Sequence, residues 1–146
     1  MIYCDTSFLL SLYIADSWSD IADRWVREKA QPVVWTLWHE LEFTTALEAR
    51  VGRGDTERDV ANAVFRSLIE HQASGFLLKQ PVRSWSEVTT RACQVARAHG
   101  AHCLSRSFDV LHVALCLELE LKLFLSFDRR QVKLAKRLGL EAPDLM

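Results

Sequence analysis

Short apolar runs alternate with longer stretches of helical periodicity along the whole of this 146-residue chain. The short runs have the length of buried strands and end in polar or turn-forming residues; they are 2–4, 32–35, 75–82 and 122–127. The longer stretches have the pattern of helices, and they cover 8–14, 17–30, 37–50, 56–73, 86–99, 108–119 and 130–138. The stretch 108–119 is nearly all apolar, so we expect this helix to be buried on most sides. The pattern therefore predicts strands that alternate with helices.

The ends of the predicted elements carry the residues that such ends favour. Thr36 is placed to cap the helix that follows it, and Ser84 or Ser86 is placed to cap the helix over 86–99. Gly100 is predicted to end that helix, because glycine readily adopts the left-handed conformation of a helix C-terminus. Because a helix that joins two parallel strands packs back onto the sheet, the alternation predicts an α/β fold with a central parallel sheet covered on both faces.

The composition is that of one ordinary globular domain, with 49% hydrophobic and 25% charged residues, and we expect a single domain over 1–146. No apolar run in the sequence approaches the ~20 residues that span a bilayer, so no membrane partner is predicted. The N-terminus reaches Asp5 before the apolar region of a signal peptide develops, and we therefore expect a cytoplasmic protein. The formal net charge is −1, so any contact with nucleic acid must use local patches.

The cysteines do not predict a metal site or a disulfide framework. Cys4, Cys93, Cys103 and Cys116 lack the CxxC spacing of zinc and redox motifs. Cys4 and Cys116 sit inside apolar segments, where a free thiol behaves as a small hydrophobic group.

Four carboxylates occupy suggestive positions among the predicted elements: Asp5, Glu42, Asp109 and Asp128. Asp5 and Asp128 each follow a strand, and the carboxyl ends of parallel strands share the edge where an open α/β sheet places its active crevice. Clustered carboxylates raise one another's pKa unless a cation neutralises them. Carboxylate oxygens favour hard ions, so the four acids predict a Mg²⁺ or Mn²⁺ site. Such ions activate water for phosphodiester hydrolysis.

Two serines and one ambiguous glutamate complete this candidate site. Ser7 and Ser126 each stand two residues from a strand-end acid, close enough to orient the carboxylates by hydrogen bonds. The helix acid is Glu42 or Glu40, because residues two apart on a helix point about 200° apart and cannot both face one site. Both helix faces are partly apolar, so amphipathicity does not choose. The small residues one turn after Glu42 leave room for metal and phosphate, which favours Glu42.

Four motifs, in this order and spacing, resemble those of PIN-domain ribonucleases, and most closely the VapC-type toxins of prokaryotic toxin–antitoxin pairs. They are Asp5-Thr6-Ser7, Glu42 with Ala46-Leu47, Ser107-Phe108-Asp109-Val110-Leu111-His112-Val113-Ala114 and Leu123-Phe124-Leu125-Ser126-Phe127-Asp128-Arg129-Arg130. The resemblance covers essentially the whole chain, and the register of the family also favours Glu42. Many relatives carry threonine where Ser126 stands, so the hydroxyl is retained.

The resemblance implies a three-layer α/β/α sandwich and a Mg²⁺- or Mn²⁺-dependent endoribonuclease. One or two ions would be bound by the four carboxylates, with Ser7 and Ser126 orienting them. The products would be a 5′-phosphate and a 3′-hydroxyl. The resemblance also implies homodimerisation and inhibition by a small antitoxin protein.

Two other functions compete with this interpretation. A metal-dependent phosphatase or receiver-like domain also places aspartates at strand ends, but it would want paired acids after the first strand and a lysine after a later one. Here Asp5-Thr6-Ser7 has no second acid, and Asp128 is followed by arginines. The second alternative is a non-catalytic PIN-like module that acts through protein contacts.

Several further residues have both a structural and a functional interpretation. His112 lies one turn after Asp109, but a histidine on an apolar helix is more often a satisfied core side chain. Most of the tryptophans fall in helix or strand patterns that predict core or dimer positions. Two basic groups are either solvated surface or phosphate-binding patches: Arg129, Arg130, Lys133, Lys136 and Arg137 near the C-terminus, and Arg50, Arg53 and Arg58 around the Gly-rich turn.

Overall fold

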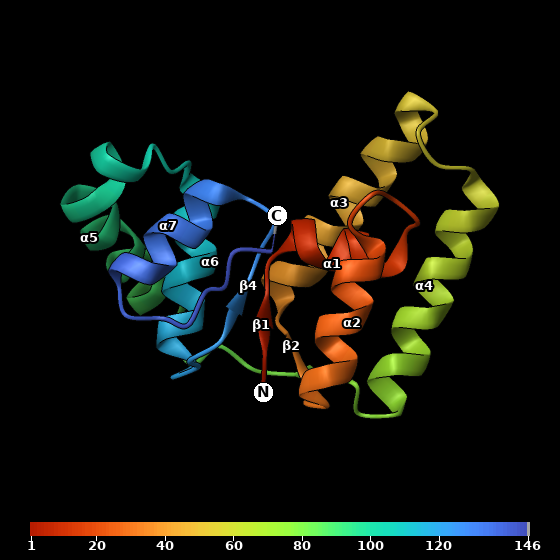
Figure 1. Cartoon of the computed structure of the whole chain (residues 1–146), viewed down its shortest axis with the longest axis horizontal. Helices are drawn as coiled ribbons and strands as arrows, with labels where there is room; N and C mark the ends of the chain where they lie inside the picture. Colours follow the sequence, from red (N-terminus) through yellow and green to blue (C-terminus); the bar gives the residue numbers. More distant parts are fainter. Residues whose placement is uncertain (146) are drawn as a thin grey trace. The chain divides into compact units, whose positions relative to one another are not determined.

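The computed structural model describes residues 1–145, and within that range it contains seven helices and four short strands (Figure 1). Met146, the last residue of the predicted domain, lies outside the described residues. The chain divides into two compact units, one made of Met1–Ser7 with the part of the chain from Val82 onward, and one made of Phe8–Pro81. Each unit holds one pair of parallel strands, and the predicted parallel pairing is thereby confirmed.

The first unit is built on a strand pair and three mutually packed helices. β1 (Tyr3–Cys4) pairs in parallel with β4 (Phe124–Leu125). The three helices are α5 (Trp85–Cys103), α6 (Ser107–Glu118) and α7 (Arg129–Arg137) (Figure 1). Most residues of α6 between Asp109 and Cys116 are buried, which confirms the prediction of a largely buried helix over 108–119.

The segment that follows α7 lies along the other side of β4. The backbone N–H of Glu141 donates to the carbonyl of Lys122 at 2.8 Å, and the N–H of Phe124 donates to the carbonyl of Glu141 at 2.9 Å. Ala142 and Leu145 are both buried. Glu141, Ala142 and Leu145 are therefore part of the packed structure of this unit, through backbone hydrogen bonds or through burial.

The second unit holds the other strand pair, β2 (Val33–Trp35) with β3 (Leu77–Lys79). Its helices are α1 (Thr6–Tyr13), whose first residues belong to the first unit, α2 (Ser19–Lys29), α3 (Leu37–Arg53) and α4 (Arg58–Ala73). α3 begins at the predicted cap, because the hydroxyl of Thr36 accepts the backbone N–H of His39. Phe43 on the same helix is completely buried and contributes to the core of this unit.

The end of α5 is where the prediction from sequence is wrong. Gly100 lies inside the helix instead of ending it, and α5 runs on to Cys103. Cys103 is only 3% exposed, so burial of the last turn offsets the roughly 1 kcal/mol that a helical glycine costs relative to alanine. Leu104 caps this end of the helix, with a left-handed φ of 53° and its N–H donated to the carbonyl of Gly100. Of the two candidate caps at the other end, Ser84 accepts the backbone N–H of Glu87.

The remaining elements occur where they were predicted, with shifted ends. α1 begins at Thr6 instead of Phe8, and α4 begins at Arg58 instead of Thr56. The strands are shorter than the apolar runs, because only part of each run pairs with a neighbouring strand. Within residues 1–145, none of the helices combines the length and the apolar character needed to cross a membrane.

Candidate active site

Asp5 stands directly after β1, at the centre of a small hydrogen-bond network. Its N–H still pairs with the carbonyl of Leu125 at 2.9 Å, and its side chain is only 1% exposed. The hydroxyl of Ser7 donates to the carboxylate, 2.8 Å from Oδ1 and 2.9 Å from Oδ2. The hydroxyl of Ser126 donates to Oδ2 at 2.8 Å. Two hydroxyl donors therefore fix the orientation of this buried carboxylate.

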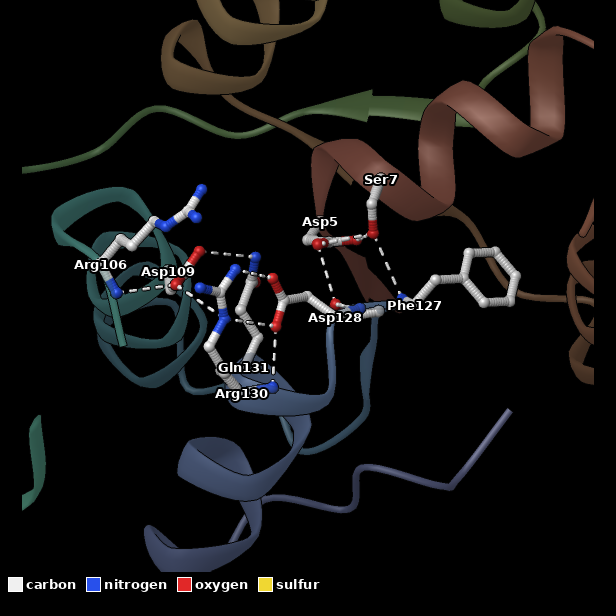
Figure 2. A network of polar contacts seen from close by, with 9 residues as sticks. Asp5, Ser7, Arg106, Asp109, Phe127, Asp128, Arg130 and Gln131 are labelled. Carbon is white, nitrogen blue, oxygen red and sulfur yellow. Dashed lines mark hydrogen bonds and ion pairs between the residues drawn. The ribbon is translucent and has the colours of Figure 1, made fainter. Parts of the chain in front are cut away.

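The same two serines connect the ends of β1 and β4. The backbone N–H of Phe127 donates to the Ser7 hydroxyl oxygen at 3.2 Å, and the N–H of Asp128 donates to the Ser126 hydroxyl oxygen at 2.9 Å. Figure 2 shows Ser7 between Asp5 and Phe127. Ser126 therefore donates to Asp5 while it accepts from the backbone of Asp128, so it couples the positions of the two strand-end acids.

Asp128 caps the N-terminus of α7 and forms a close ion pair with the first turn of that helix. Its Oδ1 accepts the backbone N–H of Arg130 at 2.7 Å. The guanidinium of Arg130 donates from Nε to Oδ1 at 3.2 Å and from Nη2 to Oδ2 at 2.7 Å. The Arg130 guanidinium, more than any other group, holds the pKa of the Asp128 carboxyl below its usual range. Asp128 is therefore an anion at neutral pH.

Asp109 lies in the first turn of α6 and is only 7% exposed. Its Oδ2 accepts the backbone N–H of Arg106 at 2.7 Å, and its Oδ1 accepts from Nε2 of Gln131 at 3.3 Å. The Nε atom of Arg130 lies 4.0 Å from Oδ2. The first turn of α7 therefore contacts both Asp128 and Asp109, as Figure 2 shows.

The structure thus brings five of the predicted site residues into one unit, and all of them belong to the network of Figure 2 or adjoin it: Asp5, Ser7, Asp109, Ser126 and Asp128. Glu42 lies on α3 in the other unit and is half-buried, whereas Glu40 is exposed. Burial thus distinguishes the two glutamates, which amphipathicity alone did not.

The oxygens of this site suit a hard divalent ion, although the acidic side chains do not form a close group. Among residues 1–145, no three acidic, histidine or cysteine side chains are grouped closely enough to hold an ion. The carboxylate oxygens are nevertheless the ligands that Mg²⁺ and Mn²⁺ prefer. Beside them, Oε1 of the buried Gln131 lacks a hydrogen-bond partner in the described part of the chain. A buried oxygen without a partner next to Asp109 is chemically suited to such an ion.

A sequence model of the PIN domain matches residues 2–137 of the chain. The chain belongs to the PIN domain family. PIN domains have a nuclease-type fold and are typically metal-dependent, so the predicted fold class, an α/β/α sandwich with parallel strands, is confirmed together with the family. A comparison with curated proteins gave no match.

Three residues of this PIN domain contact the acids but were not predicted as part of the site: Arg106, Arg130 and Gln131. Arg106 contributes only its backbone N–H, which no sequence pattern distinguishes. Arg130 belonged to a basic run with two open interpretations, and its position two residues after Asp128 was the available signal. Gln131 carried no signal, since a single amide on a basic helix is unremarkable in sequence.

His112 has the structural role expected of a histidine on an apolar helix. It is 1% exposed, and its Nδ1 and Nε2 lie 2.9 Å from the hydroxyl of Tyr3 and 3.4 Å from the hydroxyl of Thr6. Both ring nitrogens therefore have partners inside the PIN domain, which confirms the interpretation as a satisfied core side chain.

The basic run on α7 is largely engaged within the PIN domain. Lys133 donates to the carbonyl of His102 at 2.6 Å, and Lys136 pairs with Asp144 at 2.8 Å. Arg129 is exposed. These lysines line an open pocket of about 470 Å³ whose walls are Arg129, Val132, Lys133, Lys136, Asp144 and Leu145.

Proposed function

We propose that this protein is a metal-dependent endoribonuclease, the toxin of a toxin–antitoxin pair, formed by one PIN-like domain over 1–146 and acting in the cytoplasm. The observation that carries the proposal is the network in which Ser7 and Ser126 hold Asp5 beside the backbone of Asp128. Buried carboxylates fixed by hydroxyl donors suit a site that must present anionic oxygens in a set geometry. Membership of a typically metal-dependent nuclease family supports the same chemistry.

The carboxylates of this site share one task in the proposed reaction, and the groups that bond them orient them for it. Asp5, Asp109 and Asp128, with Glu42 from α3, would hold Mg²⁺ or Mn²⁺. A bound ion would supply an activated water and neutralise charge on the phosphodiester. Ser7 and Ser126 keep the Asp5 carboxylate oriented, and the backbone N–H of Arg106 does the same for Asp109.

A cleavage assay with matched variants tests the proposal. Wild-type protein is incubated with a total RNA pool and Mn²⁺, and the cut ends are mapped. Asp5→Asn should lower the cleavage rate by about 100-fold or more, because it removes a charged ligand, and loss of a group that merely orients a ligand already costs about 10- to 100-fold. Glu42→Gln should also lower the rate strongly. Glu40→Gln is the matched control and should cleave like the wild type, because Glu40 is exposed and differs from Glu42 only by position on α3.

The controls separate loss of chemistry from loss of fold. Thermal unfolding of each variant shows whether the fold survives, and Asp128→Asn provides a second ligand variant at a half-buried position. Undiminished cleavage by folded Asp5→Asn and Asp128→Asn proteins would contradict the proposal. Cleavage that persists in excess chelator would contradict the metal dependence.

The toxin role adds a protein partner to the RNA substrate. Because the site is acidic, a small antitoxin protein could block it by placing an arginine or lysine among the carboxylates. We further propose that the protein is a homodimer, as toxins of this type are. A short reading frame for a small DNA-binding protein, overlapping or directly preceding this one, would support the toxin role, and a mapped complex that avoids the acids would contradict this mode of inhibition.

A further inference from the structure

Arg130 has the position that a bound cation would be expected to take between two of the acids. Its guanidinium makes two hydrogen bonds with the carboxylate of Asp128, and its Nε lies 4.0 Å from Oδ2 of Asp109. Figure 2 shows the guanidinium between Asp109 and Asp128. The side chain is 35% exposed, so it can move away from Asp128 without unpacking a core.

The hydrogen bonds of Arg130 use the oxygens that a metal ion would need. Oδ1 of Asp128 accepts both the backbone N–H and the Nε of Arg130, and Oδ2 accepts Nη2. A carboxylate offers about four lone-pair positions, and these three bonds leave little room for an ion with strict ligand geometry. A guanidinium and a divalent ion a few ångströms apart also repel each other. Both cations therefore cannot hold Asp128 fully at the same time.

Gln131, the next residue, provides an independent sign that a ligand belongs here. Its side chain is 6% exposed, and its Nε2 donates to Asp109. Its Oε1 is buried and has no hydrogen-bond partner among the described residues. A buried acceptor without a partner is costly, and an amide oxygen is a ligand that hard cations accept. The first turn of α7 therefore carries two relevant groups. Arg130 would compete with a metal ion for Asp128, and Oε1 of Gln131 is a buried oxygen that a metal ion could bind.

We propose that Arg130 is a resident cation that competes with the divalent metal for Asp128, so that metal binding requires the guanidinium to leave this carboxylate. This inference rests on the metal site of the proposed function. In the absence of metal, Arg130 pairs with Asp128 and lies close to Asp109, so its charge partly offsets theirs. Metal affinity is consequently lower than the carboxylates alone would give, and the difference is encoded by one side chain.

Titration calorimetry with Mn²⁺ tests this competition without using catalytic activity. The variants are Arg130→Gln and Arg129→Gln, which remove the same charge from adjacent residues. Arg129 is exposed and makes no ion pair within residues 1–145, so it controls for the general loss of positive charge. Arg130→Gln should bind Mn²⁺ about three- to thirtyfold more tightly than the wild type, whereas Arg129→Gln should stay within about twofold.

A third variant and a ligand control make the outcomes decisive. Arg130→Lys keeps the charge but loses the two-pronged contact, and its affinity should lie between those of the wild type and Arg130→Gln. Equal or weaker binding by folded Arg130→Gln, or equal tightening by Arg129→Gln, would overturn the inference while the metal site stands. Absence of Mn²⁺ binding in the wild type, or undiminished binding by Asp128→Asn, would overturn the metal site itself and the inference with it.

Discussion

The imidazole of His112 joins three elements of the first unit through its two nitrogens. It lies on α6 and contacts the hydroxyl of Tyr3 on β1 and the hydroxyl of Thr6 at the start of α1. His112→Ala should therefore lower the free energy of unfolding by about 2–4 kcal/mol, because it leaves a cavity and removes the ring nitrogens that bond the hydroxyls of Tyr3 and Thr6. Urea unfolding followed by circular dichroism measures the change.

The control for this substitution is another histidine of the same unit. His102 is exposed, and Lys133 contacts it at the backbone carbonyl, which a change of its side chain does not remove. His102→Ala should change the free energy of unfolding by no more than about 0.5 kcal/mol. If His112→Ala unfolds at the same urea concentration as His102→Ala, the imidazole does not contribute to stability as its contacts suggest.

The site residues are predicted mainly by their positions relative to the strands, and less by their residue types. Asp5 and Asp128 could be predicted because each follows an apolar run, and Ser7 and Ser126 because they stand two residues away. The sequence did not predict that Ser126 donates to the acid of the other strand, since that depends on the pairing of β1 with β4. The contacts of Arg130 with Asp128 and Asp109 depend on the direction of its side chain at the start of α7. The spacing of residues in the sequence does not specify that direction.

The helix α5 contains a glycine at a position where neither its backbone conformation nor its neighbours require one. Gly100 has helical neighbours, and a methyl group at its Cα would meet nothing within 4 Å. Gly100→Ala should therefore raise the free energy of unfolding by about 0.5–1 kcal/mol, because alanine loses less backbone entropy on entering a helix. Chemical denaturation of the two proteins measures the difference.

Gly54 provides the matched comparison at the end of α3. A methyl group there also meets nothing within 4 Å, but Gly54 has a φ of 78°. Gly54→Ala should be destabilising by about 1 kcal/mol, because a Cβ disfavours the left-handed conformation. The two substitutions differ in backbone conformation but not in available space. The same sign of change for both would show that backbone conformation does not decide the effect.

The periodicity of the sequence determines which elements form but not where each one ends. It located each helix and strand, because burial of one face imposes a repeat on the sequence. Periodicity does not determine the end of α5, because Gly100 is a local stop signal whereas the burial of Cys103 is a property of the packed unit. Strand lengths were overestimated for a similar reason, since an apolar run continues past the residues that pair.

The burial of its four cysteines shows which parts of the first unit exclude solvent. Cys4, Cys103 and Cys116 are buried, whereas Cys93 is exposed, and none of these four thiols is in a disulfide. Burial raises the pKa of the Cys116 thiol to about 12, and burial together with the charge of Asp5 raises the pKa of Cys4 well above its usual range. These thiols stay protonated and unreactive near neutral pH.

Thiol labelling should therefore distinguish one cysteine from the other three. When native protein is treated with a disulfide reagent at pH 8, about one thiol per chain should react quickly, that of Cys93. After unfolding in guanidinium, all four thiols should react. Cys93→Ser is the control, and it should remove the fast phase. Rapid labelling of a second thiol in the native variant would show that this unit opens on the timescale of the reaction.

The segment after α7 limits how another protein could bind to the edge of β4. A strand with one unpaired edge offers its backbone as a template on which another chain can add a strand. Here the backbone of Glu141 already occupies the edge of β4 that β1 leaves open, and Leu145 is buried further along. A partner that recognises extended backbone cannot extend β4 at this point unless it first displaces the chain's own C-terminal segment. A partner that binds along this edge of β4 must therefore recognise side chains instead of extended backbone.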